Sequence, residues 1–451
     1  MEKMTLREIA LAVNGRLLHG NEMALIDKVS TNSKQADAST LFIALKGERF
    51  DGHDFICDFY QQGGAAVISQ KETGGQPVIL VEDTLLALGD LARHYRSNFS
   101  LPVVGITGSA GKTSTRRMVE SVLSAAGAVC STQGNLNNQI GMPMTLLSLN
   151  SDHRYAVIEM GMNHAGEIRY LTKISRPGIA VITNIGTAHI GNLGSREAIL
   201  AAKLEILEGL PPGGFALFNG DDPRLWAQKG KLPHRAFYYG IHNPECDLRA
   251  IDVNCRALES DFIVNGTGFT VHTPGEHHVY NALAAIAIGL ELGLPMADIQ
   301  RGVGDFRPAD MRQAILEQNG IRVIEDCYNA NAESMMAALS VLAASDLGGR
   351  RVAVLGDMYE LGEFTELEHR RVGDFVAKKK IDLLVTVGGY AKFIAEQAIL
   401  GGVHALSFEN NQAALAELRN LIKGKDTVLV KASRGAKFEE ISRNIISREK
   451  A

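Results

Sequence analysis

Short apolar runs alternate with amphipathic helical patterns along the last third of the chain. Buried strands are expected over four of these runs: IRVIED (321–326), RVAVLGD (351–357), DLLVTVG (382–388) and TVLVKAS (427–433). Helices are expected around residues 332–344, 366–379, 390–399, 411–423 and 436–447. Strands that alternate with helices imply right-handed crossovers, so this pattern predicts a doubly wound parallel sheet.

Four residues stand where the predicted strands of this sheet end. Asp326, Asp357, Gly388 and Ser433 all fall at carboxyl ends. Ligands of doubly wound sheets bind in the crevice beyond those ends. The sequence therefore predicts a ligand site at this edge of the sheet.

The preceding two thirds of the chain show the same α/β alternation in two further blocks. The first, up to about residue 98, mixes short strands such as LFIAL and PVILV with helices such as LLALGDLARHYRS. The second begins at SLPVVGIT, includes the apolar strands YAVIEM and IAVITNI, and ends near Phe306-Arg307-Pro308. Strands without a polar face are typical of a parallel sheet covered on both sides. A chain of 451 residues is too long for one core, and we expect domains over 1–98, 99–309 and 310–451.

Composition and charge exclude several classes of protein. Hydrophobic residues make up 45% and charged residues 22%, as in ordinary globular proteins. The 46 basic and 51 acidic residues give a net charge of −5, which argues against a broad nucleic-acid surface. The most apolar segment, ALAAIAIGLELGL, is too short to span a bilayer, and the start of the chain lacks the apolar core of a secretion signal. We therefore expect a cytoplasmic protein that neither binds nucleic acid nor inserts into a membrane.

The run VVGITGSAGKTST (103–115) predicts a phosphate-binding loop, although its spacing departs from the usual one. The usual pattern places a glycine at position 106, where this chain has Ile106. A β-rich run precedes the loop and an amphipathic helix follows it, so backbone N–H groups at a helix N-terminus are available to an anion. Lys112 is expected to contact the β- and γ-phosphates of a nucleotide, and the Thr113 hydroxyl to bind magnesium. The alternative, a plain glycine-rich turn, is disfavoured because strand, loop, Lys-Thr and helix occur together.

Two residues near the ends of neighbouring apolar strands are candidates for the same site. Glu159 lies near the end of YAVIEM, where a metal-bound nucleotide needs a carboxylate. His189 lies in the connection after IAVITNI, within reach of the same edge. Taken alone, each is more often a solvated surface residue. The loop beside Glu159 favours the metal role for that residue.

Lys203 lies in a helix whose expected N-cap is Ser195, and it falls on an apolar stripe of that helix. The stripe consists of Ile199, Ile206, Leu207 and Leu210. Burial disfavours a charged amine, so the pKa of Lys203 should be lowered, and a neutral amine can react with carbon dioxide to form a carbamate. The alternative is a lysine that snorkels to the surface, and spacing alone favours this alternative.

Two asparagine-rich loops carry further polar groups. They are GNLNNQIG (134–141) and DCYNANAES (326–334). Their amides and hydroxyls could bind polar ligands, but turns and helix caps explain each of them equally well.

Taken together, these motifs resemble those of the Mur ligase family. The matching runs, in order, are TGSAGKT, GNLNNQIG, the Glu159 strand, NHAGEI, TAHIGNLGS with AAKLEI, HHVYNALAA, DMRQ, DCYNANAESM, GDMYELG and KASRGA. They extend from about residue 30 to about residue 440. The resemblance implies a three-domain α/β ligase: an N-terminal domain for a UDP-linked substrate, a central ATPase domain of the P-loop type, and a C-terminal Rossmann-like domain with a doubly wound parallel sheet.

The resemblance also implies the reaction. ATP would phosphorylate the terminal carboxylate of a UDP-N-acetylmuramoyl-tripeptide, and the amine of D-alanyl-D-alanine would then attack the acyl phosphate, in cytoplasmic peptidoglycan precursor synthesis. The segment ALKGERFDGHDF and the Tyr-Asn-Ala-Asn run favour this dipeptide-adding branch of the family. The alternatives are another amide ligase of the superfamily, such as a folylpolyglutamate synthase, and a P-loop regulatory ATP-binding protein. We expect a monomer.

The site residues implied by the resemblance fall into three groups. The ATP-binding group is Thr107, Gly108, Ser109, Ala110, Gly111, Lys112, Thr113, Asn281, Arg312 and Asp326. Two magnesium ions are implied, one held by Thr113 and Glu159 and one by His189 and a carbamylated Lys203. The substrate-binding group is Ser33, Asn137, Asn138, Asn163, His164, Tyr328, Asn329, Asn331, Ser433 and Arg434. Asn32 and Lys34 depart from the Asp-Ser-Arg form that many family members have around this serine.

Overall fold

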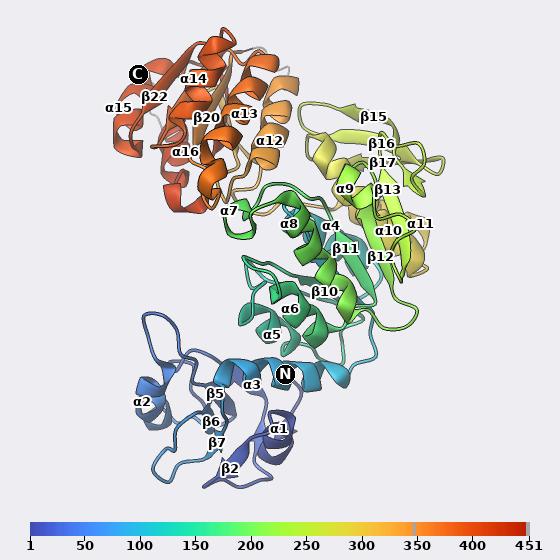
Figure 1. The fold of residues 1–451 in the computed structure, drawn as a ribbon, viewed down its shortest axis with the longest axis vertical. Helices are drawn as coiled ribbons and strands as arrows, with labels where there is room; N and C mark the ends of the chain where they lie inside the picture. Colours follow the sequence, from blue (N-terminus) through green and yellow to red (C-terminus); the bar gives the residue numbers. More distant parts are fainter. Residues whose placement is uncertain (346–348, 448–451) are drawn as a thin grey trace.

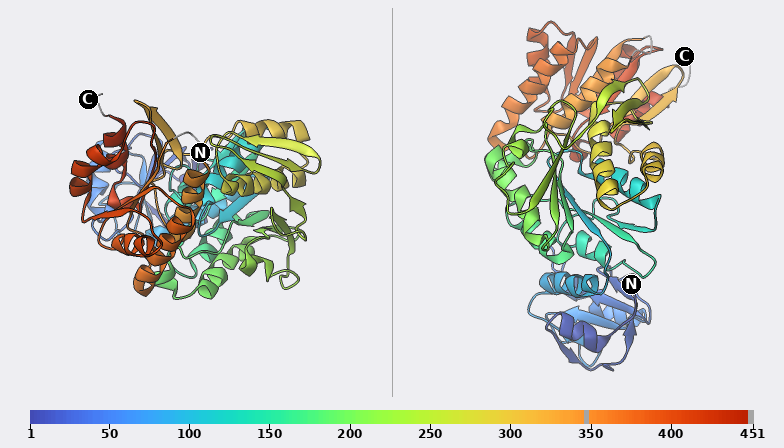
Figure 2. Two further views of the ribbon diagram at one scale, coloured as in Figure 1. Left: turned by 90° about the horizontal axis from the view of Figure 1, so that it is seen from above. Right: turned by 90° about the vertical axis from the view of Figure 1, so that its right-hand side faces the viewer.

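The computed structural model describes residues 1–345 and 349–447. The chain forms three parts in a row, with the N-terminal part at one end, the C-terminal part at the other and the central part between them (Figure 1). The right-hand view of Figure 2 shows the same order. Each part is built on its own main sheet, because strands pair only within a part.

The N-terminal part has a five-stranded sheet in the order β2-β7-β6-β5-β4, flanked by a two-stranded pair, β1 and β3. Its strands are β1 (Met4–Thr5), β2 (Arg16–Leu18), β3 (Leu25–Ile26), β4 (Lys28–Ser30), β5 (Thr40–Ile43), β6 (Ala66–Ser69) and β7 (Val78–Leu80). Its helices are α1 (Leu6–Ala12), α2 (Ile56–Gln61) and α3 (Thr84–Ser97). The buried side of α3 packs against helices of the central part, which joins the two.

The central part has a seven-stranded sheet in the order β14-β13-β12-β11-β8-β10-β9, and every pair in it is parallel. Its strands are β8 (Val103–Thr107), β9 (Val129–Ser131), β10 (Tyr155–Glu159), β11 (Ile179–Ile182), β12 (Phe215–Asn219), β13 (Arg235–Gly240) and β14 (Leu248–Arg249). Its helices are α4 (Lys112–Ser124), α5 (Gly141–Leu146), α6 (Glu167–Ser175), α7 (Ile190–Leu193), α8 (Arg196–Leu204), α9 (Pro223–Trp226), α10 (Glu276–Glu291) and α11 (Met296–Gly304). The predicted buried parallel strands are confirmed, because β8, β10 and β11 are buried over almost their whole length.

A three-stranded antiparallel sheet, which the sequence analysis did not predict, adjoins the central part. It contains β15 (Ile251–Cys255), β16 (Ser260–Val264) and β17 (Thr267–Val271). Its strands carry many half-exposed polar residues, so they lack the long apolar runs that identified the other strands. The turn at Asn265–Gly266, where φ is +49° and +76°, is a hairpin signal that could have revealed it.

The C-terminal part has a six-stranded sheet in the order β18-β19-β23-β20-β21-β22. Its strands are β18 (Ala314–Gln318), β19 (Ile321–Glu325), β20 (Arg351–Gly356), β21 (Leu383–Val387), β22 (Ala405–Phe408) and β23 (Thr427–Lys431). Its helices are α12 (Ala332–Ala344), α13 (Thr365–Lys378), α14 (Lys392–Leu400), α15 (Asn411–Leu421) and α16 (Glu439–Ile446). The four strands and five helices predicted from the sequence are all present, within a few residues of the expected bounds.

The predicted doubly wound parallel sheet of the C-terminal part is confirmed, and it carries one antiparallel edge strand that the sequence analysis did not predict. Strand β18 pairs with β19 in the antiparallel direction, through a turn at Asn319–Gly320. Ile315 and Leu316 are the large apolar residues of β18, and every position of the strand is exposed or half-buried, so this short strand gave no buried-strand pattern. An antiparallel edge strand on an otherwise parallel sheet is common in doubly wound folds.

No helix in the described ranges is long and apolar enough to cross a membrane.

Candidate functional site

A cavity of about 470 Å³ lies between the central and C-terminal parts. The parallel strands β8, β10 and β11 are neighbours, so their carboxyl ends and the loops that follow them meet at one side of this cavity. The C-terminal part contributes the segment after β19, from Asp326 to Ala337, and Lys431. The predicted residues that line the cavity are Ser109, Ala110, Gly111, Lys112, Thr113, Asn137, Asn138, Glu159, Asn163, His189, Asn281, Arg312, Asp326, Tyr328, Asn329 and Asn331.

The predicted phosphate-binding loop connects β8 to α4. Gly111 adopts φ +79° and is the N-cap of α4, so the first N–H groups of the helix face the cavity side of the loop. Lys112 Nζ donates a hydrogen bond to Gly108 O at 2.9 Å, across the loop. Desolvation lowers the pKa of Lys112, although the nearby Glu159 carboxylate acts in the opposite direction.

Asn184, which the sequence analysis did not single out, supports this loop. Its backbone oxygen accepts from Ser109 N at 3.0 Å, and its side-chain oxygen accepts from Ala110 N at 3.0 Å. Its side-chain nitrogen donates to Ala110 O, which also accepts a 2.6 Å bond from the hydroxyl of Thr183. Both residues belong to the run ITNIG after β11, so the motif was visible, but its contact with the loop depends on the pairing of β11 with β8.

Gly108 offers a test of how closely the loop is held. Its φ is +153°, and a Cβ there would lie 1.8 Å from the Thr183 hydroxyl oxygen. We expect Gly108→Ala to displace Thr183, to destabilise the fold by about 1–3 kcal/mol and to lower kcat by about tenfold, because the Thr183–Ala110 bond shapes the loop. Phosphate release and thermal unfolding measure the two effects.

Gly213 provides the matched control for that substitution. It also has a positive φ, of +86°, but nothing lies within 4 Å of the position of its Cβ. Gly213→Ala should cost stability without lowering kcat. Equal losses of kcat in Gly108→Ala and Gly213→Ala would show that the loss comes from backbone strain in general rather than from a changed phosphate-binding loop.

Glu159 ends β10 beside the loop, since it pairs with Ile106 of β8. The side chain is 2% exposed. Its Oε1 accepts a 2.8 Å hydrogen bond from Asn137, whereas its Oε2 accepts none within the described part of the chain. Arg116 Nε lies 3.6 Å from that second oxygen and balances its charge. A buried carboxylate oxygen without a donor matches the hard oxygen ligands that magnesium prefers, and Thr113 lines the same cavity.

His189 follows β11 and adopts φ +62° immediately before α7. Its Nδ1 lies 2.6 Å from Glu360 Oε2 of the C-terminal part. The pKa of Glu360 is lowered, mainly by this contact with His189. Glu360 belongs to the run GDMYELG, but the sequence analysis assigned no role to this glutamate. Among the described residues, no group of three or more His, Cys, Asp and Glu side chains is arranged as a metal site.

Lys203 is buried in the central part, with 1% of its surface exposed. The expectation from spacing, a lysine that snorkels to the surface, is wrong because the amine lies inside the protein. Burial lowers the pKa of Lys203 well below its usual range, and the positive charge of Lys112 adds to the effect. Its amine makes no hydrogen bond or ion pair with any residue that the structure describes. Lys203 is not among the residues that line the cavity.

The apolar stripe around Lys203 is real but does not belong to one helix. Helix α8 begins after its predicted N-cap, Ser195, and ends at Leu204. Ile206 and Leu207 lie in the following 3-10 helix, Glu205–Gly209, and Leu210 comes directly after it. These residues are buried. The change of helix type preserves the buried face because the spacing of three to four residues is nearly maintained.

Three further residues of the cavity lining, Asn281, Arg312 and Asp326, carry polar or charged groups that a ligand could contact. Asn281 accepts a 2.9 Å hydrogen bond from the Thr115 hydroxyl, and its Nδ2 has no acceptor among the described residues. The guanidinium of Arg312 lies 4.2 Å from the ring centre of Tyr328, as a cation–π pair. Asp326 accepts a 2.7 Å bond from Lys431 Nζ. The buried, unpaired amide nitrogen of Asn281 is a donor available to a ligand.

The asparagine-rich loops serve as both caps and cavity walls. Asn331 is the N-cap of α12, accepting from Ser334 N at 2.8 Å, and its Nδ2 donates to Ser109 O at 3.3 Å. Asn138 accepts from Ile140 N and Gly141 N at the start of α5. The two interpretations of these loops are therefore compatible.

Several predicted residues lie outside the cavity lining. Arg434 pairs with Glu439 at 3.0 Å, and the buried hydroxyl of Ser433 accepts from Tyr359 N at 3.0 Å. His164 is exposed beside Glu167, and Ser33 lies in the N-terminal part after β4. The predicted residues outside the lining are Ser33, Thr107, Gly108, His164, Lys203, Ser433 and Arg434.

Comparison with known proteins places this cavity in context. Residues 25–96 match the profile described as "Mur ligase family, catalytic domain", residues 106–289 match "Mur ligase middle domain", and residues 311–434 match "Mur ligase, glutamate ligase domain". A UDP-N-acetylmuramoyl-tripeptide--D-alanyl-D-alanine ligase of Bacillus subtilis (strain 168) is 38% identical over 99% of both chains. The chain belongs to the Mur ligase family.

Solved Mur ligases share the whole fold. A crystal structure of MurF from Acinetobacter baumannii is 33% identical, with a TM-score of 0.93 over 99% of this chain and 100% of that one. MurF from Thermotoga maritima, solved in complex with ADP, is 28% identical, with a TM-score of 0.83 over 92% of this chain and 96% of that one. The three-part architecture is thus that of a Mur ligase.

Proposed function

We propose that this protein is an ATP-dependent ligase that joins D-alanyl-D-alanine to UDP-N-acetylmuramoyl-tripeptide during cytoplasmic synthesis of peptidoglycan precursors. One observation carries the proposal: a single cavity brings the phosphate-binding loop, Glu159 and the segment after β19 together from two parts of the chain. The near-complete match to a ligase of this name supports the choice of substrates.

The reaction has two steps that this cavity can serve. In the first, a carboxylate oxygen of the tripeptide attacks the γ-phosphorus of ATP, the bond to the β-phosphate oxygen breaks, and ADP and an acyl phosphate result. In the second, the amine of the dipeptide attacks the acyl carbon. The tetrahedral intermediate then expels phosphate and the amine nitrogen loses a proton. Several negative charges meet in the first step, so oriented cations and N–H groups must stabilise it.

The loop and helix α4 supply much of that stabilisation. The unpaired N–H groups of the first turn of α4 and its dipole favour phosphate oxygens. Lys112 adds a full positive charge beside them. When a nucleotide binds, the amine of Lys112 exchanges its hydrogen bond to Gly108 O for one to a phosphate oxygen. Thr107, Ser109, Ala110 and Gly111 form the rest of the loop.

The chain has ligands for the magnesium that accompanies ATP. Thr113 and the unpaired oxygen of Glu159 would hold one ion, while His189 and a carbamylated Lys203 would hold a second. Bound magnesium would neutralise charge on the phosphates and on the acceptor carboxylate. The carbamate suits Lys203 because a buried amine of lowered pKa is nucleophilic, and its product is an anion facing Lys112.

The remaining residues position the three substrates. Asn281, Arg312 and Asp326 bind the nucleoside end of ATP. Ser33 contacts the UDP-linked substrate from the N-terminal domain, and Asn137, Asn138, Asn163 and His164 contact it from the central domain. Tyr328, Asn329, Asn331, Ser433 and Arg434 contribute to ATP and dipeptide binding from the C-terminal domain. The domains span 1–98, 99–309 and 310–451.

Phosphate release tests the proposal directly. Purified protein is mixed with ATP, magnesium and UDP-N-acetylmuramoyl-tripeptide, with and without D-alanyl-D-alanine. Continuous release is expected only when the dipeptide is present, because the second step is needed to free phosphate and regenerate the site. Release at the same rate without the dipeptide would remove the proposed function, as would turnover that depends on a protein partner instead.

A further inference from the structure

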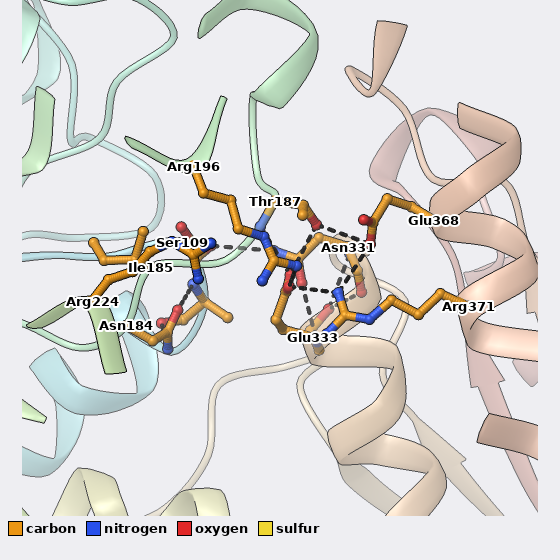
Figure 3. Close-up of polar contacts among 12 residues, drawn as sticks. Ser109, Asn184, Ile185, Thr187, Arg196, Arg224, Asn331, Glu333, Glu368 and Arg371 are labelled. Carbon is orange, nitrogen blue, oxygen red and sulfur yellow. Dashed lines mark hydrogen bonds and ion pairs between the residues drawn. The ribbon is translucent and has the colours of Figure 1, made fainter. Parts of the chain in front are cut away.

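A cluster of charged residues joins the central and C-terminal domains at the wall of the cavity, which Glu333 helps to line. The cluster consists of Glu333, Thr187, Arg196, Glu368 and Arg371, and Figure 3 shows Glu333 at its centre. Glu333 Oε1 lies 3.2 Å from Arg196 of the central domain and 3.1 Å from Arg371 of its own domain. We call this set the Glu333 cluster.

The second oxygen of Glu333 holds the connection that follows β11. It accepts from Thr187 N at 3.1 Å and from the Thr187 hydroxyl at 3.0 Å. Gly186 lies so close that a Cβ there would be 2.6 Å from the Glu333 carboxylate. Thr187 is fully buried. The glutamate therefore holds the backbone of this connection at a fixed position.

The connection that Glu333 holds carries two functional residues, one on each side of Thr187. Asn184 shapes the phosphate-binding loop through Ser109 and Ala110, and His189 faces the cavity. Asn331 reaches Ser109 directly, and Glu360 reaches His189. The C-terminal domain thus contacts the loop, the connection and the histidine through three separate residues.

The charges of the Glu333 cluster balance within it. Two arginines face two glutamates, and Glu368 lies 3.1 Å from Arg371. The pKa of Glu333 is lowered despite its burial, because Thr187 N donates to it and the two arginines attract its charge. A balanced and fully hydrogen-bonded carboxylate has no spare capacity for a substrate amine, so its contacts suit domain docking better than substrate binding.

We infer, on the basis of the proposed function, that Glu333 is a positioning residue: its bonds to Thr187 and Arg196 make the geometry of the 184–189 connection depend on docking of the C-terminal domain. Docking then aligns Asn184 and His189 with the phosphates, although Glu333 itself touches no reacting atom. Arg371 pairs with both Glu333 and Glu368, and so ties the Glu333 side chain to helix α13 of its own domain.

A double-mutant cycle tests this coupling. Glu333→Gln and Arg196→Gln should each lower kcat by about tenfold, while the KM for ATP changes less than about twofold. The kcat of the double variant should fall by far less than the product of the two single losses, because both variants break the same contact. Small-angle scattering with nucleotide and UDP-substrate bound should show a less compact particle for Glu333→Gln than for the parent. The unfolding temperature should stay within about 2 °C of the parent, because the cluster joins domains rather than filling a core.

Glu396→Gln is the matched control. Glu396 pairs with Arg370 at 2.8 Å, but both residues are in the C-terminal domain. This variant should keep parent kcat and compaction. Parent kcat in Glu333→Gln, or losses that multiply in the double variant, would overturn the inference. Phosphate release by the parent protein that does not depend on the dipeptide would instead remove the proposed function. The scattering comparison of Glu333→Gln with the parent would still decide whether Glu333 docks the two domains.

Discussion

Lys203→Ala should be nearly inactive, with kcat lowered by at least about 100-fold, and a short carboxylic acid added to the solution should restore part of the activity. The reason is the environment of Lys203. The side chain is 1% exposed, and burial together with Lys112 lowers its pKa well below the usual range. A neutral amine there can take up carbon dioxide, and the added acid would replace the lost anion in the space that the alanine leaves.

Lys203→Arg separates this role from packing. Arginine keeps a positive charge and cannot be carbamylated, so it should stay as inactive as the alanine variant, and carboxylic acids should not rescue it. Steady-state phosphate release across a series of acids of increasing length measures the rescue. Parent activity in Lys203→Arg would show that neither a carbamate nor an anion is needed at this position.

Lys112→Ala should lower kcat by about 1,000-fold and leave the fold intact. The internal bond that Lys112 makes is to Gly108 O, a loop carbonyl, and the loop keeps its other bonds to Thr183 and Asn184. Its loss therefore removes charge stabilisation of the transferring phosphoryl group rather than packing. Circular dichroism and thermal unfolding should match the parent, while phosphate release should be close to background.

Arg117→Ala is the control for Lys112→Ala, because it removes a positive charge from the same helix. Arg117 is half-buried and donates to Arg307 O rather than to a loop carbonyl. It should retain most of the parent kcat. A Lys112→Ala enzyme with near-normal kcat would show that the loop does not hold the reacting phosphates.

Apolar periodicity was sufficient to predict most of the fold. Strands such as β10 and β20 are buried on both faces, so their sequences contain few polar residues and are easily recognised. Among the elements that were missed, β15, β16, β17, β18 and β22 have exposed or half-buried positions because they lie in a small sheet or at a sheet edge. The Asn-Gly turns at 265–266 and 319–320 were the remaining local signal for β16, β17 and β18.

The candidate site was predictable to the extent that its residues lie in contiguous motifs. The loop from Thr107 to Thr113 and the strand end at Glu159 required only a strand, a turn and a helix to be identified. Asn184 and Glu333 could not be found in this way. Their roles come from partners about 75 and 146 positions away in the chain, and such contacts exist only after the sheets and domains have assembled.

The bonds between Asn184 and the phosphate-binding loop also affect how the enzyme releases its products. Ser109 N and Ala110 N are already occupied by Asn184, so the donors left for phosphate are the first turn of α4 and Lys112. A loop with fewer free donors gives up some affinity for phosphate and ADP alike. We therefore expect the bonds that Asn184 makes to the loop to ease the release of ADP and phosphate.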